Sequence, residues 1–327
     1  MLEGFAFFTE AIFLGIYLYG RDRVSPGLHL FSGIVVAVSG ALSAAFVTLV
    51  NAFMNNPGGI DPVAALLSPS WRVQVVHVLL SSYEATAVAM AGIHAAMLLR
   101  HPGSTLHRKA LGLALPVACL TALAQPLSGD FSAKHVARHQ PVKLAAAEGH
   151  FRTEAFAPLR IGGWPDEERR ETRGAIELPG GLSFLGFGDF HHEVKGLDEF
   201  PRPLWPPVLR THLAFQVMVG AGTALALLAV VTIGLSLRRR ALPTARPFLW
   251  AVALAGPLGF VALEAGWLVT EWGRQPWIVR GLMRTAEAVT PFRPLAAPFV
   301  TFALVYLFLG AVVVYLLYRQ VRSTEHA

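Results

Sequence analysis

The sequence is poor in cysteine and in charge. Cys119 is the single cysteine among 327 residues, which excludes an internal disulfide framework and a site built from paired thiolates. Asp, Glu, Lys and Arg make up only 15% of the chain, against about 25% in a typical soluble domain. The chain has no internal repeat, and none of its apolar runs shows the pattern of a signal peptide. Disordered, fibrous and ordinary soluble proteins are therefore excluded.

Apolar residues are abundant instead, at 54% of the chain, and they gather in long runs. A helix that crosses a bilayer needs about 20 mostly apolar residues. The runs that meet this length lie at roughly 4–20, 28–54, 72–99, 109–127, 208–237, 246–271 and 295–318. The sequence therefore predicts an all-α, polytopic membrane bundle of about seven helices. Its parts are four helices in 1–127, a long loop at 128–207 and three helices in 208–327.

The net charge of +6 comes from basic residues placed between the apolar runs. Arg21 with Arg23, and the run 238–240, lie in alternate short loops. Because basic loops stay on the cytoplasmic side, the N-terminus and the loop 128–207 are expected outside and the C-terminus inside. The basic excess therefore predicts a membrane and no nucleic acid. The outer segment 272–294 is nevertheless rich in arginine, which indicates an anionic group or an acidic partner there.

Four acids fall inside the predicted helices, where ionisable residues are costly and are functional candidates. They are Glu3, Glu10, Glu84 and Glu264. Glu3 and Glu10 are seven residues apart and share one helix face, which suits a proton path or a metal site. The alternative is an acid at a helix mouth that reaches for water. Glu84, and His94 on the same helix, could face a partner subunit, but a polar contact between helices is the simpler interpretation.

Two further residues are of the types that bind haem iron. His77 lies early in the third apolar run, where a neutral imidazole suits either an iron or a structural hydrogen bond. Met218, taken alone, is typical of core filling. A His and a Met from two helices would make a six-coordinate, low-spin haem b, but the sequence does not pair them.

A third candidate group lies near the end of the sixth run. Glu264, Trp267 and Glu271 fall on one helix face, and Arg274 and Trp277 follow at once. An arginine and a tryptophan there suit the holding of a propionate and the capping of a ring system, with Glu264 and Trp267 as further cofactor-binding candidates. The alternative is an aromatic and basic anchor at the membrane surface.

Several segments, taken together and in order, resemble subunit I of the cytochrome bd quinol oxidase family. They are 3–10, 51–57, 76–77 with Tyr83, 140–149, 215–220, 264–267 and 273–277. The most specific are Lys-Leu-Ala-Ala-x-Glu at 143–148 and Gly-Arg-Gln-Pro-Trp at 273–277. The resemblance covers essentially the whole chain, and it makes 128–207 a short form of the family's quinol-binding loop.

The resemblance implies cofactors and their ligands. His77 and Met218 would be the axial ligands of haem b558, and Glu264 would ligate haem b595. Glu3 would lie beside the pair formed by haem b595 and haem d, or a third haem b in its place. Arg274 would meet haem propionates.

The resemblance also implies a reaction. Lys143 and Glu148 would bind and deprotonate quinol, and Glu10 and Ser43 would lie on the proton route to the oxygen site. The implied function is a quinol:oxygen oxidoreductase of the respiratory chain in a prokaryotic cell membrane. Its expected partners are subunit II, small single-helix subunits, membrane quinol and lipid.

The sequence departs from the family in two places. The family's subunit I has nine spanning helices, and the two without a counterpart here carry a haem-ligating histidine that His29 does not replace by position. A truncated sequence is our expectation. A separate chain supplying the helices, or a diverged haem b electron-transfer module without oxygen reduction, is the alternative. The second departure is Gln216, two residues before Met218. Members of the family can have a basic residue at this position, and its loss would remove one partner for a haem propionate.

Overall fold

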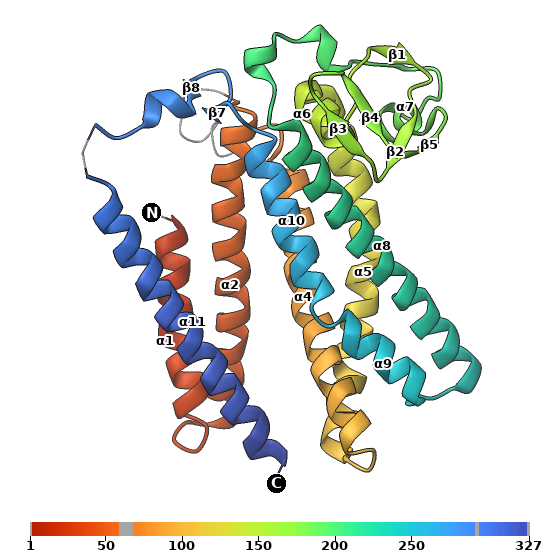
Figure 1. Cartoon of the computed structure of the whole chain (residues 1–327). Helices are drawn as coiled ribbons and strands as arrows, with labels where there is room; N and C mark the ends of the chain where they lie inside the picture. The colour runs from red at the N-terminus through yellow and green to blue at the C-terminus, as the bar shows by residue number, and fades with distance from the viewer. Residues whose placement is uncertain (1, 59–67, 292–293, 326–327) are drawn as a thin grey trace. The chain divides into compact units, whose positions relative to one another are not determined.

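The computed structural model describes residues 2–58, 68–291 and 294–325. It divides into two compact units, Met1–Thr285 and Ala286–Ala327, which are described separately. The helices of the first unit (Figure 1) are α1 (Leu2–Tyr19), α2 (Pro26–Asn55), α4 (Trp71–Arg100), α5 (Thr105–His139), α6 (Pro141–Glu148), α7 (Gly181–Phe187), α8 (Val208–Arg239), α9 (Arg246–Ala255) and α10 (Leu258–Trp272). The second unit holds α11 (Ala296–Glu325).

Seven spans in the described residues are long and apolar enough to cross a membrane. They are α1, α2, α4, α5, α8, α9 with α10, and α11. The predicted fold class, a helical membrane bundle, is therefore confirmed. The large apolar side chains that stay exposed, such as Leu113 and Leu120 on α5, are those of a surface that faces lipid.

Small residues set the packing of α4 against α9 and α10. A Cβ on Gly92 would lie 2.7 Å from the Cα of Gly256, and a Cβ on Gly259 would lie 2.6 Å from the Cα of Ala85. Glycine and alanine allow helix backbones to approach this closely in membranes. The first contact joins residue 92 of α4 to residue 256, just before α10, and the second joins residue 85 of α4 to residue 259 of α10. The residue numbers fall on α4 while they rise toward α10, so α4 and α10 are antiparallel.

The sixth predicted helix is broken, whereas the fourth is longer than its apolar run. The chain turns at Gly256 and Pro257, because proline supplies no backbone N–H and clashes with the preceding turn. In contrast, α5 continues to His139, beyond the predicted end at 127, with Pro116 and Pro126 inside it. Hydropathy marks only the part of a helix that lies in lipid, and the rest of α5 is polar.

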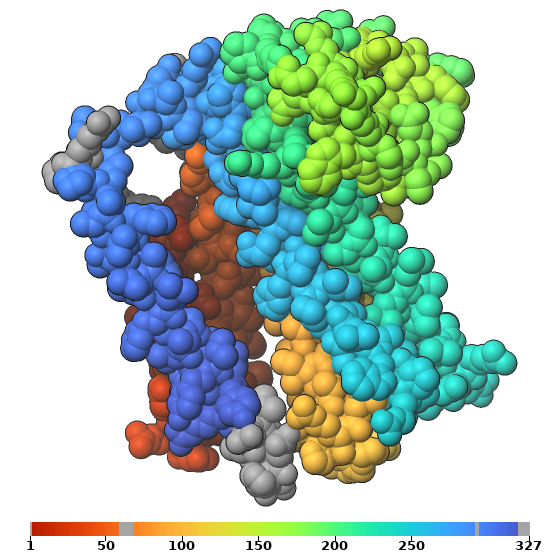
Figure 2. Space-filling model, in the orientation of Figure 1, coloured from red at the N-terminus to blue at the C-terminus, as the bar shows by residue number. Residues whose placement is uncertain are grey.

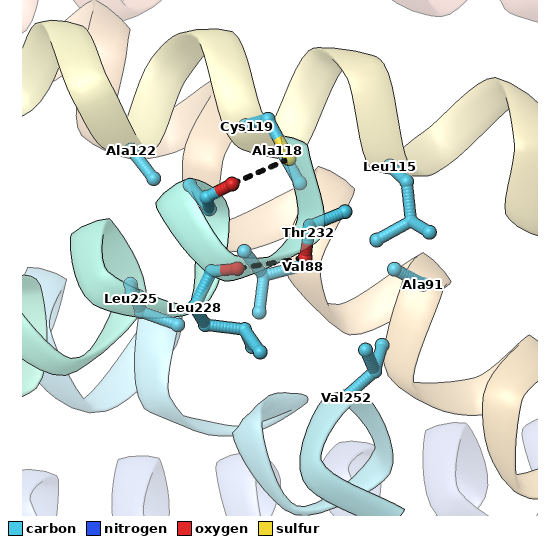
Figure 3. A pocket seen from close by; sticks show the side chains of 11 residues that line it. Val88, Ala91, Leu115, Ala118, Cys119, Ala122, Leu225, Leu228, Thr232 and Val252 are labelled. Atoms are coloured by element: carbon cyan, nitrogen blue, oxygen red, sulfur yellow. Dashed lines mark hydrogen bonds between the residues drawn. The ribbon is translucent and has the colours of Figure 1, made fainter. Parts of the chain in front are cut away.

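A small cavity of about 20 Å³ lies between α4, α5, α8 and α9 (Figure 3). Its walls are apolar except for Cys119 and Thr232. Both donate to carbonyls of α8, Cys119 Sγ at 3.9 Å from Ala229 O and Thr232 Oγ1 at 2.7 Å from Leu228 O. A void of this size holds one water at most, and these walls give it no polar partner. It is a packing defect and not a ligand site.

Residues 140–207 form a folded lobe at one end of the first unit (Figure 2). The lobe begins with α6, and its remainder, residues 149–207, is called the loop domain below. The loop domain contains three short antiparallel pairs, with α7 and the 3-10 turns Leu197–Glu199 and Arg202–Leu204. The pairs are β1 (Glu154–Ala155) with β6 (Glu193–Val194), β2 (Leu159–Ile161) with β5 (Ile176–Leu178), and β3 (Trp164–Asp166) with β4 (Glu171–Arg173). A fourth pair, β7 (Trp277–Val279) with β8 (Met283–Arg284), follows α10, and the turn Thr285–Ala288 comes after it.

Candidate functional site

The short helix α6 carries two buried ionisable residues. Lys143 is 7% exposed and Glu148 is 4% exposed. The helix begins after Gln140 with Pro141 in its first turn and ends at Gly149, whose φ of 60° is the left-handed conformation that glycine adopts without strain. A Cβ on Gly149 would lie 2.6 Å from Thr172 Oγ1, so the loop domain packs tightly on the end of α6.

Lys143 begins a chain of hydrogen bonds that joins three helices. Its Nζ donates to Asn55 Oδ1 at 2.7 Å and to the carbonyl of Thr270 at 3.3 Å. Asn55 Nδ2 donates to Asn51 Oδ1 at 2.8 Å, and Asn51 Nδ2 donates to Glu271 Oε1 at 2.8 Å. The other oxygen of Glu271 accepts from Arg274 at 2.6 Å. These five residues, Lys143, Asn55, Asn51, Glu271 and Arg274, are called the amide-linked network below.

The network holds more positive charge than it neutralises. Burial, together with the cations of Arg274 and Arg280, lowers the pKa of Lys143 to about 7 against the opposing effect of Glu271. Arg274 is 7% exposed, and its Nε and one Nη have no acceptor among the described residues. Burial also lowers the pKa of Arg274, and Glu271 opposes that shift. Free, buried guanidinium N–H groups are suited to a carboxylate ligand such as a haem propionate.

Glu148 occupies the opposite end of α6. Burial raises its pKa to about 8, and the Arg160 guanidinium lowers it in part. One of its carboxylate oxygens has no donor among the described residues. Arg160 donates to His150 Nδ1 at 3.1 Å, and burial lowers the pKa of that histidine to about 4. His150 is therefore neutral at pH 7, whereas Glu148 titrates close to it.

His77 has the surroundings of an oriented ligand. Its Nδ1 lies 2.9 Å from Ser128 Oγ on α5. Ser128 donates its own proton to the carbonyl of Gln125, so its oxygen accepts from Nδ1–H of His77. This tautomer leaves the lone pair on Nε2, the arrangement that orients a metal-binding histidine. The amide of Gln125 lies 3.3 Å from that Nε2.

Met218 and His77 lie at the same depth of the bundle. A Cβ on Gly266 would be 3.0 Å from Met218 Sδ, so the thioether lies against α10. His77 is eight residues from Ala85, about 12 Å along α4, and Gly266 is seven residues from Gly259, about 10 Å along α10. Because Ala85 and Gly259 touch and the helices are antiparallel, both candidate ligands lie on one level.

The other predicted residues are distributed over two places. Glu264 is exposed and lines a groove of about 600 Å³ between α8 and α10, and Trp267 is 39% exposed on the same helix. Glu3 is exposed on α1. The carboxylate of Glu10 lies against α2, where a Cβ on Gly40 would be 3.4 Å from its Oε1, and Ser43 follows Gly40 by one turn.

The two residues left without a role are on α4. His94 Nδ1 lies 3.0 Å from His107 Nδ1 on α5, so His94 makes the polar contact between helices that the simpler interpretation predicts. Glu84 is 4% exposed, and its Oε1 has no donor among the described residues.

The sequence did not assign roles to Asn51, Asn55, Glu271 or Arg160. Asn51 and Asn55 were visible as two amides four residues apart in the last turns of an apolar helix, a pattern that places both on one face. Their partner, Glu271, lies more than two hundred residues away in sequence, and nothing in the local pattern indicates that contact.

These features define a polytopic helical membrane protein that buries an acid and an amine beneath a folded loop domain. The family model described as "Cytochrome bd terminal oxidase subunit I" matches residues 1–325, and the chain belongs to that family. Membership implies haem cofactors, and the arrangement at His77, Met218 and Arg274 fits such groups.

Individual relatives of the chain carry names of the same family. The chain is 38% identical over 339 residues to "Putative cytochrome bd menaquinol oxidase subunit I" of Bacillus subtilis (strain 168), covering 98% of this chain and 76% of the relative. It is 31% identical over 351 residues to "Cytochrome bd ubiquinol oxidase subunit 1" of the same organism, covering 98% and 74%. A solved structure, "The structure of bd oxidase from Geobacillus thermodenitrificans", is similar with a TM-score of 0.90 at 40% identity, covering 98% of this chain and 76% of that one.

Proposed function

We propose that this chain is the haem-carrying, quinol-oxidising subunit of a bd-type quinol:oxygen oxidoreductase. The observation that carries the proposal is the buried pair on α6, with Lys143 bound into the amide-linked network and Glu148 enclosed under the loop domain. Oxidation of a quinol releases two protons and two electrons. It therefore needs a base that titrates near neutral pH and a group that holds the quinol oxygen.

The pair on α6 supplies both. With a pKa of about 8, Glu148 is a stronger base than an ordinary carboxylate, which suits it to accept a quinol hydroxyl proton. Lys143, with a pKa of about 7, is suited to donate a hydrogen bond to a quinol oxygen. The enclosed surroundings keep both groups from bulk water.

His77 Nε2 and Met218 Sδ would hold the low-spin haem, which would accept one electron at a time through its iron and, with both protein ligands bound, would not bind oxygen. Arg274 has free N–H groups for a propionate. For a high-spin haem, with Glu3 beside it, the family resemblance implies Glu264 as the ligand, and Trp267 on the same helix would be a neighbour. Glu271 is the other carboxylate of α10, so Glu264→Gln and Glu271→Gln, compared for the high-spin signal, identify the ligand.

The remaining expectations complete the proposal. The loop domain would lie outside the cell membrane, so that protons from quinol leave there, and Glu10 and Ser43 would carry protons from the other side. Subunit II, and small single-helix subunits, would complete the enzyme.

The experiment is a reduced-minus-oxidised visible spectrum of the purified membrane complex, repeated with carbon monoxide. A low-spin b signal with a carbon-monoxide-sensitive high-spin or chlorin signal supports the full proposal. A low-spin b signal alone would limit this chain to electron transfer without oxygen reduction. A spectrum without haem would overturn the proposal.

A further inference from the structure

The strands β2 and β5 have one polar and one apolar face. Arg160 and Glu177 are cross-strand partners and form an ion pair at 3.0 Å on the face that turns toward His150. The opposite face carries Leu159 with Leu178 and Ile161 with Ile176 as cross-strand pairs. Leu159 packs on the buried core of the loop domain. In contrast, Ile161 is 48% exposed and Ile176 is 66% exposed. Apolar surface is thus left uncovered at one end of the pair.

That exposed end is fixed to the membrane helix α8. Gly162, next to Ile161, donates its N–H to Gln216 Oε1 at 2.9 Å, and its carbonyl lies 3.1 Å from His212 Nε2. Gln216 Nε2 donates in turn to the carbonyl of Arg160 at 3.0 Å. Figure 1 shows β2 and β5 on the side of the loop domain nearest the helices, beside α8.

The length of α8 places this contact relative to the bilayer. The helix has 32 residues, or about 48 Å, whereas the hydrocarbon core of a bilayer is about 30 Å thick. Arg238 and Arg239 end the helix and mark one boundary of the core. About 20 residues back from Arg238 is Met218, so Gln216 lies just outside the hydrocarbon at the other boundary.

We propose that Ile161 and Ile176 insert into the lipid headgroup region, so that this face of β2 and β5 is a membrane-contacting surface of the loop domain. The occupant is lipid, because the surface lies at the level where α8, which exposes Val219, enters the hydrocarbon. Trp164, 58% exposed beyond the same turn, is of the residue type that favours this interface. The proposal rests on the fold and not on the quinol chemistry.

The test uses the full chain, purified with its bound subunits in phosphatidylcholine nanodiscs. The buried Cys119 is replaced by alanine, and Ile176→Cys carries an environment-sensitive fluorophore. The matched control is Arg169→Cys, which is exposed in the β3–β4 turn. Its neighbour Glu167 accepts from the N–H of Val208, so the control lies about 12 Å further from the hydrocarbon than Gln216.

Lipids that carry a spin label near the headgroup are expected to quench the Ile176 label by roughly twofold and to leave the Arg169 label nearly unchanged. An Ile161→Cys label, on the cross-strand partner, must respond in the same way and covers the case in which one variant fails to fold. Absence of quenching at both isoleucines overturns the proposal, as does equal quenching at Arg169. An emission that is blue-shifted but not quenched by lipid would assign the surface to a protein partner and would also overturn it.

Discussion

Replacing Glu148 with glutamine separates a proton-accepting role from a structural one. Glutamine keeps the shape of the side chain but takes no proton. If Glu148 is the base, loss of a general base lowers the rate of quinol oxidation by about 10² to 10⁴. Haem content is expected to stay unchanged, because glutamine keeps the shape of the side chain and Glu148 is not one of the proposed haem ligands.

The stability of the same variant is expected to move in the opposite direction. The pKa of Glu148 rises from 4.5 to about 8 on folding, so the folded chain binds more protons than the unfolded chain across that range. The contribution of Glu148 to stability is therefore greatest below pH 4.5 and falls as the pH rises toward 8. At pH 7 the penalty has accumulated over 2.5 pH units, on the order of 3 kcal/mol, and Glu148→Gln removes it.

The pH profile gives a third readout. With a pKa of about 8, roughly one tenth of Glu148 is ionised at pH 7 and nine tenths at pH 9. The rate of quinol oxidation should rise about ninefold over that range in the unmodified chain, and this rise should be absent in Glu148→Gln. The assay is quinol oxidation by the complex in detergent, with thermal unfolding of the same sample. Glu193→Gln, an exposed acid of the loop domain, is the control. A variant with normal quinol kinetics, or one that loses both haem and stability, refutes the reasoning.

Three further outcomes are expected. His77→Ala should abolish the low-spin b signal while the chain still inserts, and an unchanged reduced spectrum would contradict its assignment as a ligand. Gly266→Val should push the methionine sulfur off its site and convert low-spin haem to high-spin, whereas Gly222→Val, with open space around it, should not; equal spectra of the two would argue against this geometry. Asn55→Ala removes an acceptor from a buried ammonium, worth about 1.5–3 kcal/mol, so the pKa of Lys143 should fall by one to two units below 7. The pH dependence of the quinol KM should move toward acid accordingly, and a superimposable profile would show that Asn55 does not act on Lys143.

The membrane spans were predictable from the sequence because a helix that crosses the bilayer needs about 20 mostly apolar residues in a row, and such runs are visible in the composition. The break at Gly256–Pro257 was not assigned, although its residues are typical helix breakers, because the apolar run continues across it. Hydropathy also could not predict the secondary structure within residues 140–207. Its strands have three residues or fewer, and their pairing depends on turns and on contacts with α7 and α8.

The candidate site was predictable only as far as its residues lie close in sequence. Lys143 and Glu148 were identified together because they share one motif on α6. Their partners come from α2 and α10, and a hydrogen bond such as that of Asn51 with Glu271 arises only when the helices pack. The effect of burial on Lys143 and Glu148 likewise belongs to the folded chain, since an exposed amine and acid at this spacing would titrate far from neutral pH.

The contacts that enclose Glu148 are also the contacts that hold the loop domain at the membrane. His212 on α8 faces the carbonyl of Ala147, beside Glu148, with Nδ1 at 2.9 Å, and the carbonyl of Gly162 with Nε2. One side chain therefore connects the end of α6 to the turn that we place among lipid headgroups. A quinol is itself dissolved in the membrane, so a base for its oxidation must be both shielded from water and close to the hydrocarbon boundary. The packing of α6 between α8 and the loop domain meets both requirements with the same set of residues.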